Sequence, residues 1–283
     1  MPPEREGQHP LRTIHQGTLP MDLSLKNRIA LVTGASKGIG RSIARALAKE
    51  GVKLAICARG EPDLEAAADE LRAAGADVLA VKADLVQPAD IRRFVDSAVA
   101  RFGRIDILVN NAVSSTQASF AALSDEEWKH HLDVKLMGYV RCAREVLPHM
   151  QKAGGGRIIN VAGMSARIVT EYRITNGAVN AAVTNFTKHL SEQVGKDGIT
   201  VNAIHPGYTW TPRLEAVLRR WSELDRLPLE EVTALRLKEI PIGRFIQPED
   251  LANLALFLCT DAASAITGQA IAVDGGSGRS INY

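Results

Sequence analysis

Short apolar runs alternate with amphipathic stretches along the whole chain. The runs are continuous rather than alternating, which predicts strands buried on both faces, as in a parallel sheet. The stretches between them carry apolar residues at helical spacing. This pattern predicts one α/β domain, a doubly wound parallel sheet of about seven strands with helices on both faces. The expected strands lie near residues 28–33, 53–58, 77–83, 105–110, 156–162, 199–204 and 270–273.

A glycine-rich turn follows the first expected strand and precedes a helical pattern. Its sequence is Thr33-Gly34-Ala35-Ser36-Lys37-Gly38-Ile39-Gly40. Gly34 suits a tight turn, Gly38 has no Cβ to obstruct a phosphate, and Gly40 allows close packing of strand and helix. Since free N–H groups at a helix N-terminus bind pyrophosphate, the turn predicts a dinucleotide site of the Rossmann type. An ordinary strand-to-helix turn is the alternative.

The composition limits the classes of function. The chain has 283 residues, 46% hydrophobic and 23% charged, which suits one domain with a large core. The net charge of +2, without Lys/Arg clusters, argues against a nucleic-acid partner. No apolar run reaches the roughly 18 residues of a membrane span, so no membrane partner is expected.

The cysteines and the N-terminus indicate a cytoplasmic protein. Cys57, Cys142 and Cys259 are scattered and mostly inside apolar runs, which predicts buried thiols in a reducing compartment. Residues 1–20 are polar and lack the apolar segment of a signal peptide. We therefore expect a flexible extension at 1–20 and a single domain at 21–283.

The spacing Thr-Gly-x-x-x-Gly-x-Gly, with the motifs below, resembles the short-chain dehydrogenase/reductase family over about residues 24–277. The resemblance implies an oxidoreductase that uses a nicotinamide cofactor on a carbonyl or an alcohol. It also implies a homodimer or homotetramer, because family members associate through long helices and C-terminal strands. The implied cofactor contacts in the turn are Gly34, Ser36, Lys37, Gly38, Ile39 and Gly40.

The end of the second strand favours NADP(H) over NAD(H). Family members that prefer NAD usually carry an acidic residue where this chain has Ala58. A carboxylate there would repel a 2′-phosphate, whereas Arg59 and Lys37 can pair with it. The alternative is that both are solvated surface cations.

Three later segments resemble further cofactor contacts of the family. Asp84-Leu85 resembles the pair that contacts adenine, and Asn110-Asn111-Ala112-Val113 resembles an Asn-Asn-Ala-Gly motif. Val113 replaces the glycine and narrows the floor under the nicotinamide ribose. Pro206-Gly207 and Thr211 match the segment that holds the nicotinamide carboxamide.

The four catalytic positions of the family carry other residues in this chain. The family uses asparagine, serine, tyrosine and lysine; the matching residues here are Lys135, Gly163, Asn176 and Asn180. In the family a cation lowers the pKa of the tyrosine, which then acts as proton donor. We expect Asn180, at the lysine position, to contact the cofactor. We expect Asn176, at the tyrosine position, to be a catalytic residue.

Tyr172 is a candidate for the missing proton donor. It lies four residues before Asn176, so a helix that extended this far would place both side chains on one face. Lys135 would lower the pKa of Tyr172, and Ser165 lies two residues past the serine position. The alternative is a surface tyrosine beside an inactive site.

The segment 212–243 is expected to form a helical flap over the substrate. Leu214, Leu218 and Trp221 share one helical face and either wall an apolar pocket or face the core. His130 and His131 begin no metal site, since adjacent helical side chains diverge by about 100° and no acidic or cysteine cluster accompanies them.

Three functions remain open from the sequence. The first is an NADP(H)-dependent oxidoreductase with a relocated proton donor, acting on a small apolar carbonyl or alcohol. The second is a non-redox enzyme that uses Lys135, Asn176 and Asn180, and the third is a nucleotide-binding protein without turnover. The retained segment 206–211 favours the first function, and the four changed positions favour the others. The sequence does not identify the substrate.

Overall fold

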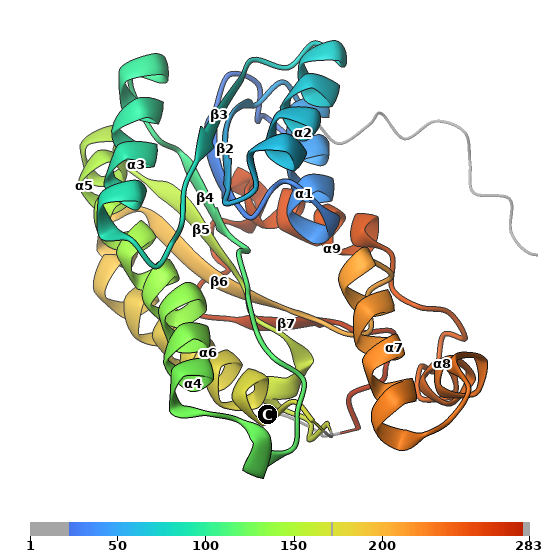
Figure 1. Ribbon diagram of the computed structural model, residues 1–283. Helices are drawn as coiled ribbons and strands as arrows, with labels where there is room; N and C mark the ends of the chain where they lie inside the picture. The colour runs from blue at the N-terminus through green and yellow to red at the C-terminus, as the bar shows by residue number, and fades with distance from the viewer. Residues whose placement is uncertain (1–22, 171, 280–283) are drawn as a thin grey trace, which may run out of the picture.

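A seven-stranded sheet, parallel throughout, forms the centre of the protein in a computed structural model that describes residues 23–170 and 172–279 (Figure 1). The strand order is β3-β2-β1-β4-β5-β6-β7. The expected extension at 1–20 lies outside the described residues. The strands are β1 Ile29–Thr33, β2 Lys53–Ala58, β3 Val78–Lys82, β4 Ile107–Asn110, β5 Gly156–Val161, β6 Ile199–Pro206 and β7 Ala270–Val273. Every strand that the sequence predicts is present.

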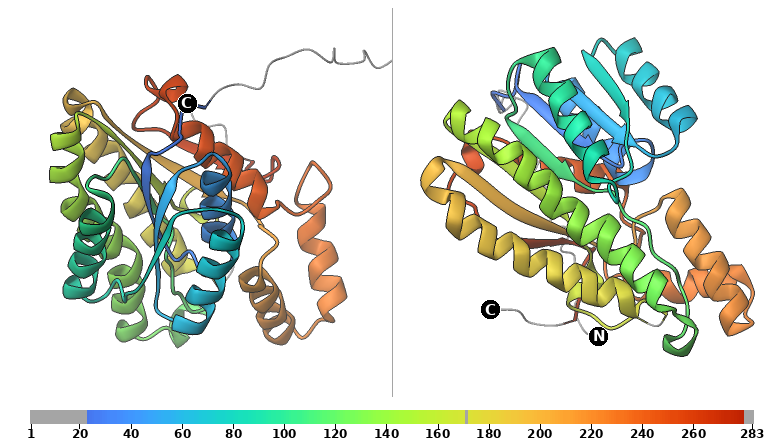
Figure 2. Two further views of the ribbon diagram at one scale, coloured as in Figure 1. Left: turned by 90° about the horizontal axis from the view of Figure 1, so that it is seen from above. Right: turned by 60° about the vertical axis from the view of Figure 1, so that its left-hand side comes forward.

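Helices cover both faces of the sheet, as the alternating pattern predicts (Figure 2). One face carries α1, α2 and α9, and the other carries α3, α5 and α6 (Figure 1). The helices are α1 Gly38–Lys49, α2 Glu61–Ala73, α3 Pro88–Phe102, α4 Asp125–His131, α5 Gly138–Ala153, α6 Ile174–Val194, α7 Pro212–Asp225, α8 Leu229–Lys238 and α9 Pro248–Leu258. A short π-helix, Leu132–Met137, joins α4 to α5.

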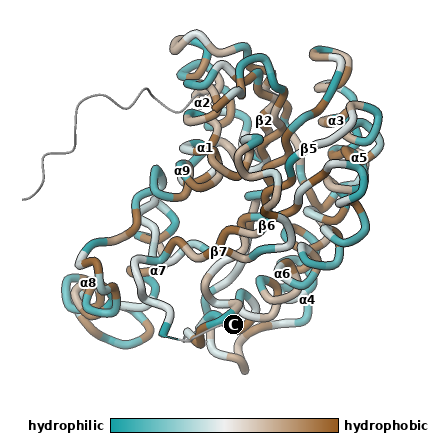
Figure 3. The backbone as a smooth tube through the Cα atoms, turned by 180° about the vertical axis from the view of Figure 1, so that it is seen from behind, coloured by the Kyte–Doolittle hydropathy of each residue, from teal (hydrophilic) through white to brown (hydrophobic). Residues whose placement is uncertain are grey.

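Two apolar layers lie between the sheet and its helices. The strands are among the most hydrophobic parts of the backbone tube in Figure 3. Alternate side chains of each strand enter opposite layers, so Val32 of β1 packs in one and Leu31 in the other. This two-sided burial explains why the strands read as continuous apolar runs. Within the described residues, no helix combines the length and the apolar character that crossing a bilayer requires.

The cysteines are buried, as the sequence predicts, and the fourth helix is capped by its own side chains. Cys57, Cys142 and Cys259 are buried free thiols, and burial raises the pKa of Cys142 and of Cys259 to about 12. Helix α4 begins after Ser124, whose hydroxyl accepts a hydrogen bond from Glu127 N while the Glu127 carboxylate accepts one from Ser124 N.

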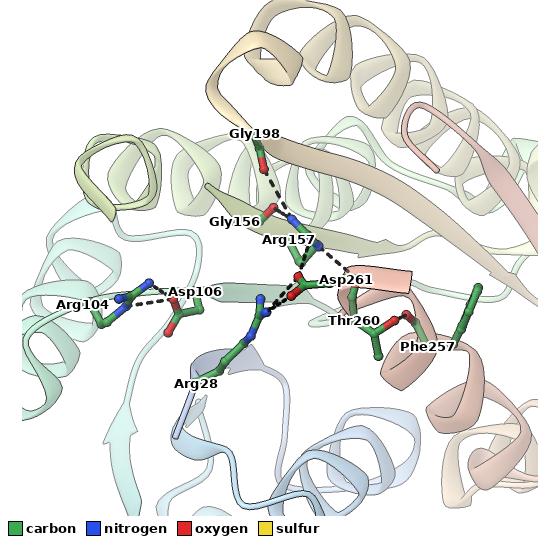
Figure 4. A network of polar contacts seen from close by, with 9 residues as sticks. All are labelled: Arg28, Arg104, Asp106, Gly156, Arg157, Gly198, Phe257, Thr260 and Asp261. Carbon is green, nitrogen blue, oxygen red and sulfur yellow. Dashed lines mark hydrogen bonds and ion pairs between the residues drawn. The ribbon is translucent and has the colours of Figure 1, made fainter. Parts of the chain in front are cut away.

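The amino ends of the strands are held by paired charges (Figure 4). Asp261 accepts from Arg28 at 2.8 Å and from Arg157 at 3.1 Å, and Asp106 pairs with Arg104 at 2.5 Å. Each arginine of this network has a carboxylate partner. We call these ion pairs the brace, and they leave no arginine of the network without a counter-charge. The candidate site lies at the opposite end of the sheet.

The winding of the chain reverses between β1 and β4. From β1 the chain passes outward through β2 to β3, and it then returns to β4 on the other side of β1. Ligands of such sheets bind beyond the carboxyl ends of the strands, at this reversal. The glycine turn after β1 and Asn111 after β4 meet there.

Candidate active site

The first turn of helix α1, which follows the glycine turn, presents backbone N–H groups. Helix α1 starts at Gly38, and the side chain of its N-cap residue, Lys37, makes no capping hydrogen bond. The first turn contains no acidic residue, so its N–H groups can bind an anion and the helix dipole favours one. Gly34 and Gly38 have φ values of +64° and +54°, a backbone region that favours glycine.

Asn111 connects the turn to β4. Its Nδ2 donates to the carbonyl oxygens of Thr33 (3.1 Å) and Gly34 (3.0 Å), and its backbone N–H donates to Thr33 Oγ1 (2.9 Å). A Cβ on Gly40 would overlap both the Gly34 carbonyl oxygen and the Asn111 amide. Gly40 therefore allows the helix to approach the strand, as expected from the sequence.

A cleft with about 1230 Å³ of empty space, open solvent included, runs along this edge. Eleven of the fifteen predicted cofactor contacts line it, namely Gly34, Ser36, Lys37, Gly38, Ile39, Arg59, Asp84, Leu85, Asn111, Ala112 and Thr211. Asn180, Pro206 and Gly207 line an adjoining cavity instead. Gly40 lines neither, because it is packed against the turn.

The two cations predicted to bind a 2′-phosphate line the cleft, but one of them is paired. Lys37 Nζ lies 2.7 Å from a carboxylate oxygen of Asp63, a residue that the sequence analysis missed. Arg59 is exposed. Arg59 is thus the cation better placed to determine the cofactor preference, because binding through Lys37 must compete with Asp63.

We expect Arg59→Ala to weaken NADPH binding by about 10- to 100-fold, the loss of one or two charge-assisted hydrogen bonds, with little effect on NADH. Calorimetric titration with both nucleotides measures the change. Lys82→Ala is the matched control, since Lys82 is an exposed cation paired with Glu61 outside the cleft. Equal loss of NADPH and NADH affinity would contradict this assignment.

The adjoining cavity contains about 890 Å³ of empty space, open solvent included. Ile39, Asn111, Val113, Thr211 and Arg213 line both it and the cleft, so the two spaces are continuous. Its remaining lining comes mainly from the ends of β5 and β6 and from α6 and α7. This is the space next to the expected nicotinamide position.

Lys135 is the buried cation of this cavity. It lies on the π-helix, is 4% exposed, and donates from Nζ to the carbonyl oxygen of Ala162 at 2.8 Å. Burial, followed by the charges of Arg213 and Arg173, holds its pKa well below the ordinary lysine value. A lowered pKa makes this ammonium a stronger acid than an ordinary lysine, so it gives up its proton more readily.

Asn176, Asn180 and Ser165 are brought together around the same cavity. Asn180 Nδ2 donates to Ser165 Oγ at 2.9 Å, whereas its buried Oδ1 has no partner among the described residues. Asn176 Nδ2 donates to the hydroxyl of Ser115 at 3.0 Å. A Cβ on Gly163 would lie 2.7 Å from Asn180 Nδ2, so the amide fills space that a larger residue at 163 would need.

The expected helical extension to Tyr172 is wrong. Helix α6 begins at Ile174, and Tyr172 has φ of +56°, so it does not share a helical face with Asn176 and Asn180. Its hydroxyl donates to Asp225 at the end of α7, 3.0 Å away, and its ring packs against the α7 cluster. The cavity lining does not include Tyr172. The geometry gives no support to its role as proton donor, which stays a prediction.

The apolar face of α7 both packs in the protein core and lines the cavity, the two alternatives that its sequence pattern left open. Leu218 and Trp221 are buried, and Trp221 packs edge-on against Tyr208 with ring centres 6.1 Å apart. Leu214 is also buried and lines the cavity. Helix α7 therefore contributes one wall of the site, and its role as a mobile flap stays a prediction.

His131 is buried without a hydrogen-bond partner in the described part of the chain. Burial, aided by the charge of Lys135, lowers its pKa from 6.5 to about 3. No group of three or more potential metal ligands is found among residues 23–170 and 172–279. His131 is a neutral packed residue.

The lowered pKa of His131 makes folding sensitive to acid. Between pH 6.5 and 3 the unfolded chain binds a proton that the folded chain does not. The free energy of unfolding therefore decreases by up to about 1.4 kcal/mol for each unit by which the pH is lowered. We expect His131→Phe to remove this contribution, measured by urea unfolding at pH 7 and pH 5. The exposed His130→Phe should keep the wild-type difference. An unchanged pH dependence in His131→Phe would contradict the assignment.

Three further candidate site residues were not predicted from the sequence. Arg173 and Arg213 line the cavity, and Ser115 Oγ accepts from Arg213 at 2.6 Å as well as from Asn176. Arg213 lies two residues after Thr211, a predicted cofactor contact, and this closeness in sequence could have marked it as a site residue. Nothing in the spacing marked Arg173 or Ser115, because they lie in the loops before α6 and after β4 and are brought to the site only by the fold.

Comparison with known proteins identifies the family. The family pattern described as Enoyl-(Acyl carrier protein) reductase matches residues 34–278. A putative ketoacyl reductase of Streptomyces coelicolor is 37% identical over 255 residues, which is 89% of this chain and 98% of that protein. A 3-oxoacyl-[acyl-carrier-protein] reductase FabG of Staphylococcus aureus is 34% identical over 248 residues, 87% of this chain and 96% of that protein.

Solved structures agree in fold. A variant of actinorhodin polyketide ketoreductase with NADPH superimposes with a TM-score of 0.87 at 36% identity, covering 89% of this chain and 98% of that one. L-sorbose reductase of Gluconobacter frateurii, complexed with NADPH and L-sorbose, has a TM-score of 0.87 at 35% identity, covering 92% of this chain and 100% of that one. These NADPH complexes support NADP(H) as the cofactor predicted from Ala58 and Arg59. Sequence, fold and comparisons together show that the chain belongs to the short-chain dehydrogenase/reductase family of oxidoreductases.

Proposed function

We propose that the protein is an NADP(H)-dependent oxidoreductase that interconverts a carbonyl compound and an alcohol, with Lys135 as the group that holds the transferred proton. The observation that carries the proposal is a buried ammonium, with a lowered pKa, in a cavity continuous with the dinucleotide cleft. Relatives named as ketoacyl reductases, and the NADPH complexes of similar proteins, support the reaction class.

The cleft suits a dinucleotide. The first turn of α1 offers N–H groups to a pyrophosphate, and the positive φ values of Gly34 and Gly38 direct the turn around it. The unpartnered Asn180 Oδ1 can accept from a ribose hydroxyl at the inner end. The cofactor, when bound, supplies or accepts the hydride.

Lys135 gives the proton that a developing alkoxide requires. Its ammonium keeps one hydrogen bond to Ala162 and has two further N–H donors. A fixed positive charge also stabilises the negative oxygen that forms during hydride transfer. In the direction of alcohol oxidation the neutral amine accepts the proton.

Ser165 positions the substrate oxygen. Because Asn180 donates to Ser165 Oγ, the serine hydroxyl keeps its own proton for a second acceptor. The carbonyl oxygen of a substrate is such an acceptor. The sequence hypothesis placed Tyr172 as acid with Lys135 and Ser165 as helpers; here Lys135 takes the role of the acid and Ser165 keeps its place.

Titration calorimetry with NADPH and NADH, followed by nicotinamide absorbance with a panel of ketones and aldehydes, tests the proposal. We expect NADPH to bind more tightly and to be oxidised in proportion to alcohol formed. NADPH binding without oxidation by any member of the panel would contradict it in favour of a non-redox enzyme or a binding protein. No described contact specifically favours those two alternatives. Homo-oligomerisation and a cytoplasmic location stay predictions.

A further inference from the structure

Three cations converge on the cavity without an acidic partner. Lys135, Arg173 and Arg213 all line it, and its lining within the described residues contains no aspartate or glutamate. The brace at the opposite end of the sheet is a useful contrast, because each arginine there pairs with Asp106 or Asp261 (Figure 4). The charge of the cavity is therefore uncompensated by the chain as far as it is described.

The partners of the three cations are all neutral. Arg173 has a buried Nε without a partner, and its pKa is lowered to about 10 by burial and by the charge of Arg213. Arg213, which is exposed, donates to Ser115 Oγ. Lys135 donates to the carbonyl oxygen of Ala162. None of them forms an ion pair with a described residue, and all three line the same cavity.

Such an arrangement is unfavourable by itself. Lys135 is the buried member of the three, and taking such a cation out of water without a counter-charge costs several kcal/mol. The like charges of Arg173 and Arg213 on the same cavity add to this cost. Charges in protein interiors are normally paired, so a missing partner in an open cavity points to a charged ligand. Arginine suits this role, since its planar fork binds carboxylate or phosphate through two parallel hydrogen bonds.

We infer that the substrate carries an anionic oxygen group, a carboxylate or a phosphate, beside the reacting carbonyl, and that Arg173 and Arg213 bind it. This rests on the proposed function and names the substrate class of the same site. Lys135 then faces the carbonyl oxygen. Met164, Ile168 and Val217 supply apolar lining for the rest of the molecule. The small apolar substrate expected from the sequence is replaced by an oxoacid or a phosphorylated hydroxyketone.

Arg173 is the better residue for testing whether these cations bind the substrate rather than the cofactor. Arg213 lines both spaces and can also reach a cofactor phosphate, whereas Arg173 lines only the inner cavity. A substitution of Arg173 therefore tests the substrate site with least disturbance of the cleft. Arg219→Ala is the control, because Arg219 is an exposed arginine on α7 outside both linings.

The experiment compares charged and neutral substrates at saturating NADPH. The pairs are acetoacetate with methyl acetoacetate, and dihydroxyacetone phosphate with dihydroxyacetone. The pair that is reduced more efficiently shows whether the site prefers a carboxylate or a phosphate. We expect kcat/KM to favour the anionic member by about 100-fold, the value of one or two charge-assisted hydrogen bonds. Arg173→Ala should reduce this ratio about 30-fold, Arg173→Lys should restore part of it, and Arg219→Ala should keep it. Equal kcat/KM for both members of each pair, or a ratio insensitive to Arg173→Ala, would overturn the inference.

A binding measurement distinguishes failure of this inference from failure of the proposed function. Malonate and inorganic phosphate are titrated calorimetrically into NADPH-saturated wild-type protein and Arg173→Ala. Binding lost in Arg173→Ala supports the anion site even if no carbonyl is reduced, in which case only the proposed reaction fails. Displacement of NADPH by malonate or phosphate would assign the cations to the cofactor and overturn the inference, as would absence of binding.

Discussion

Lys135→Met is expected to lower kcat/KM for carbonyl reduction by about 10²- to 10⁴-fold, the usual contribution of a positioned acid. NADPH affinity should change little, because Lys135 lines the inner cavity and not the cofactor cleft. Stopped-flow absorbance gives the rate, and calorimetry gives the nucleotide affinity. Turnover within a few-fold of wild type would contradict the role of Lys135.

The same variant should be more stable than the wild type near neutral pH. The folded pKa of Lys135 lies below the unfolded value of 10.5, so the unfolded chain holds the proton more tightly and the free energy of unfolding rises with pH through this window. Methionine removes the cost of burying the ammonium and the pH dependence that Lys135 gives to the free energy of unfolding. It also removes the hydrogen bond to the carbonyl oxygen of Ala162. We expect a net gain on the order of 1–3 kcal/mol, measured by urea unfolding. Lys129→Met, at an exposed position on α4, is the control and should change neither property.

Gly40→Ala is expected to abolish tight NADPH binding without altering the chemistry of the inner cavity. A Cβ at this position would overlap the Gly34 carbonyl oxygen, which is backbone and cannot rotate away. The turn must then move, and with it the N–H groups that face the pyrophosphate. We expect about 100-fold weaker binding and a loss of 1–3 kcal/mol, of the size typical of overpacking.

Gly195→Ala is the matched control for this variant. Gly195 has an ordinary helical conformation and no atom within 4 Å of an added Cβ. NADPH affinity and unfolding free energy should stay close to wild type there. If Gly40→Ala binds NADPH as tightly as Gly195→Ala does, the packing argument for the turn is wrong.

The sheet could be predicted almost completely from the sequence. Strands such as Lys53–Ala58 and Ala270–Val273 coincide with the predicted limits, because two-sided burial requires a continuous apolar run and such runs are visible in the residues themselves. The glycine turn was predictable for a similar reason. Gly34 and Gly38 adopt positive φ, a local requirement that the residue type reveals.

The inner cavity was predicted only in part. Lys135, Ser165, Asn176 and Asn180 line it as a group, since the family resemblance fixed their register. Tyr172 does not, because helix α6 begins two residues after it, and helical spacing has no meaning outside the helix. A contact with Asp225, 53 residues later, gives its hydroxyl a partner that no local pattern predicts.

What the sequence determined by itself is the order of strands and helices and the glycine turn; the replacement of the family's catalytic residues stays a prediction from the resemblance. The order and the turn follow from local periodicity and from glycine conformation. The tertiary structure alone decided that Arg173 and Arg213 line one cavity with Lys135, and that Asp63 pairs with Lys37. Charges separated by tens of residues become neighbours only when the elements that carry them pack around the same end of the sheet. Their interaction depends on distance and burial, which a linear sequence does not contain.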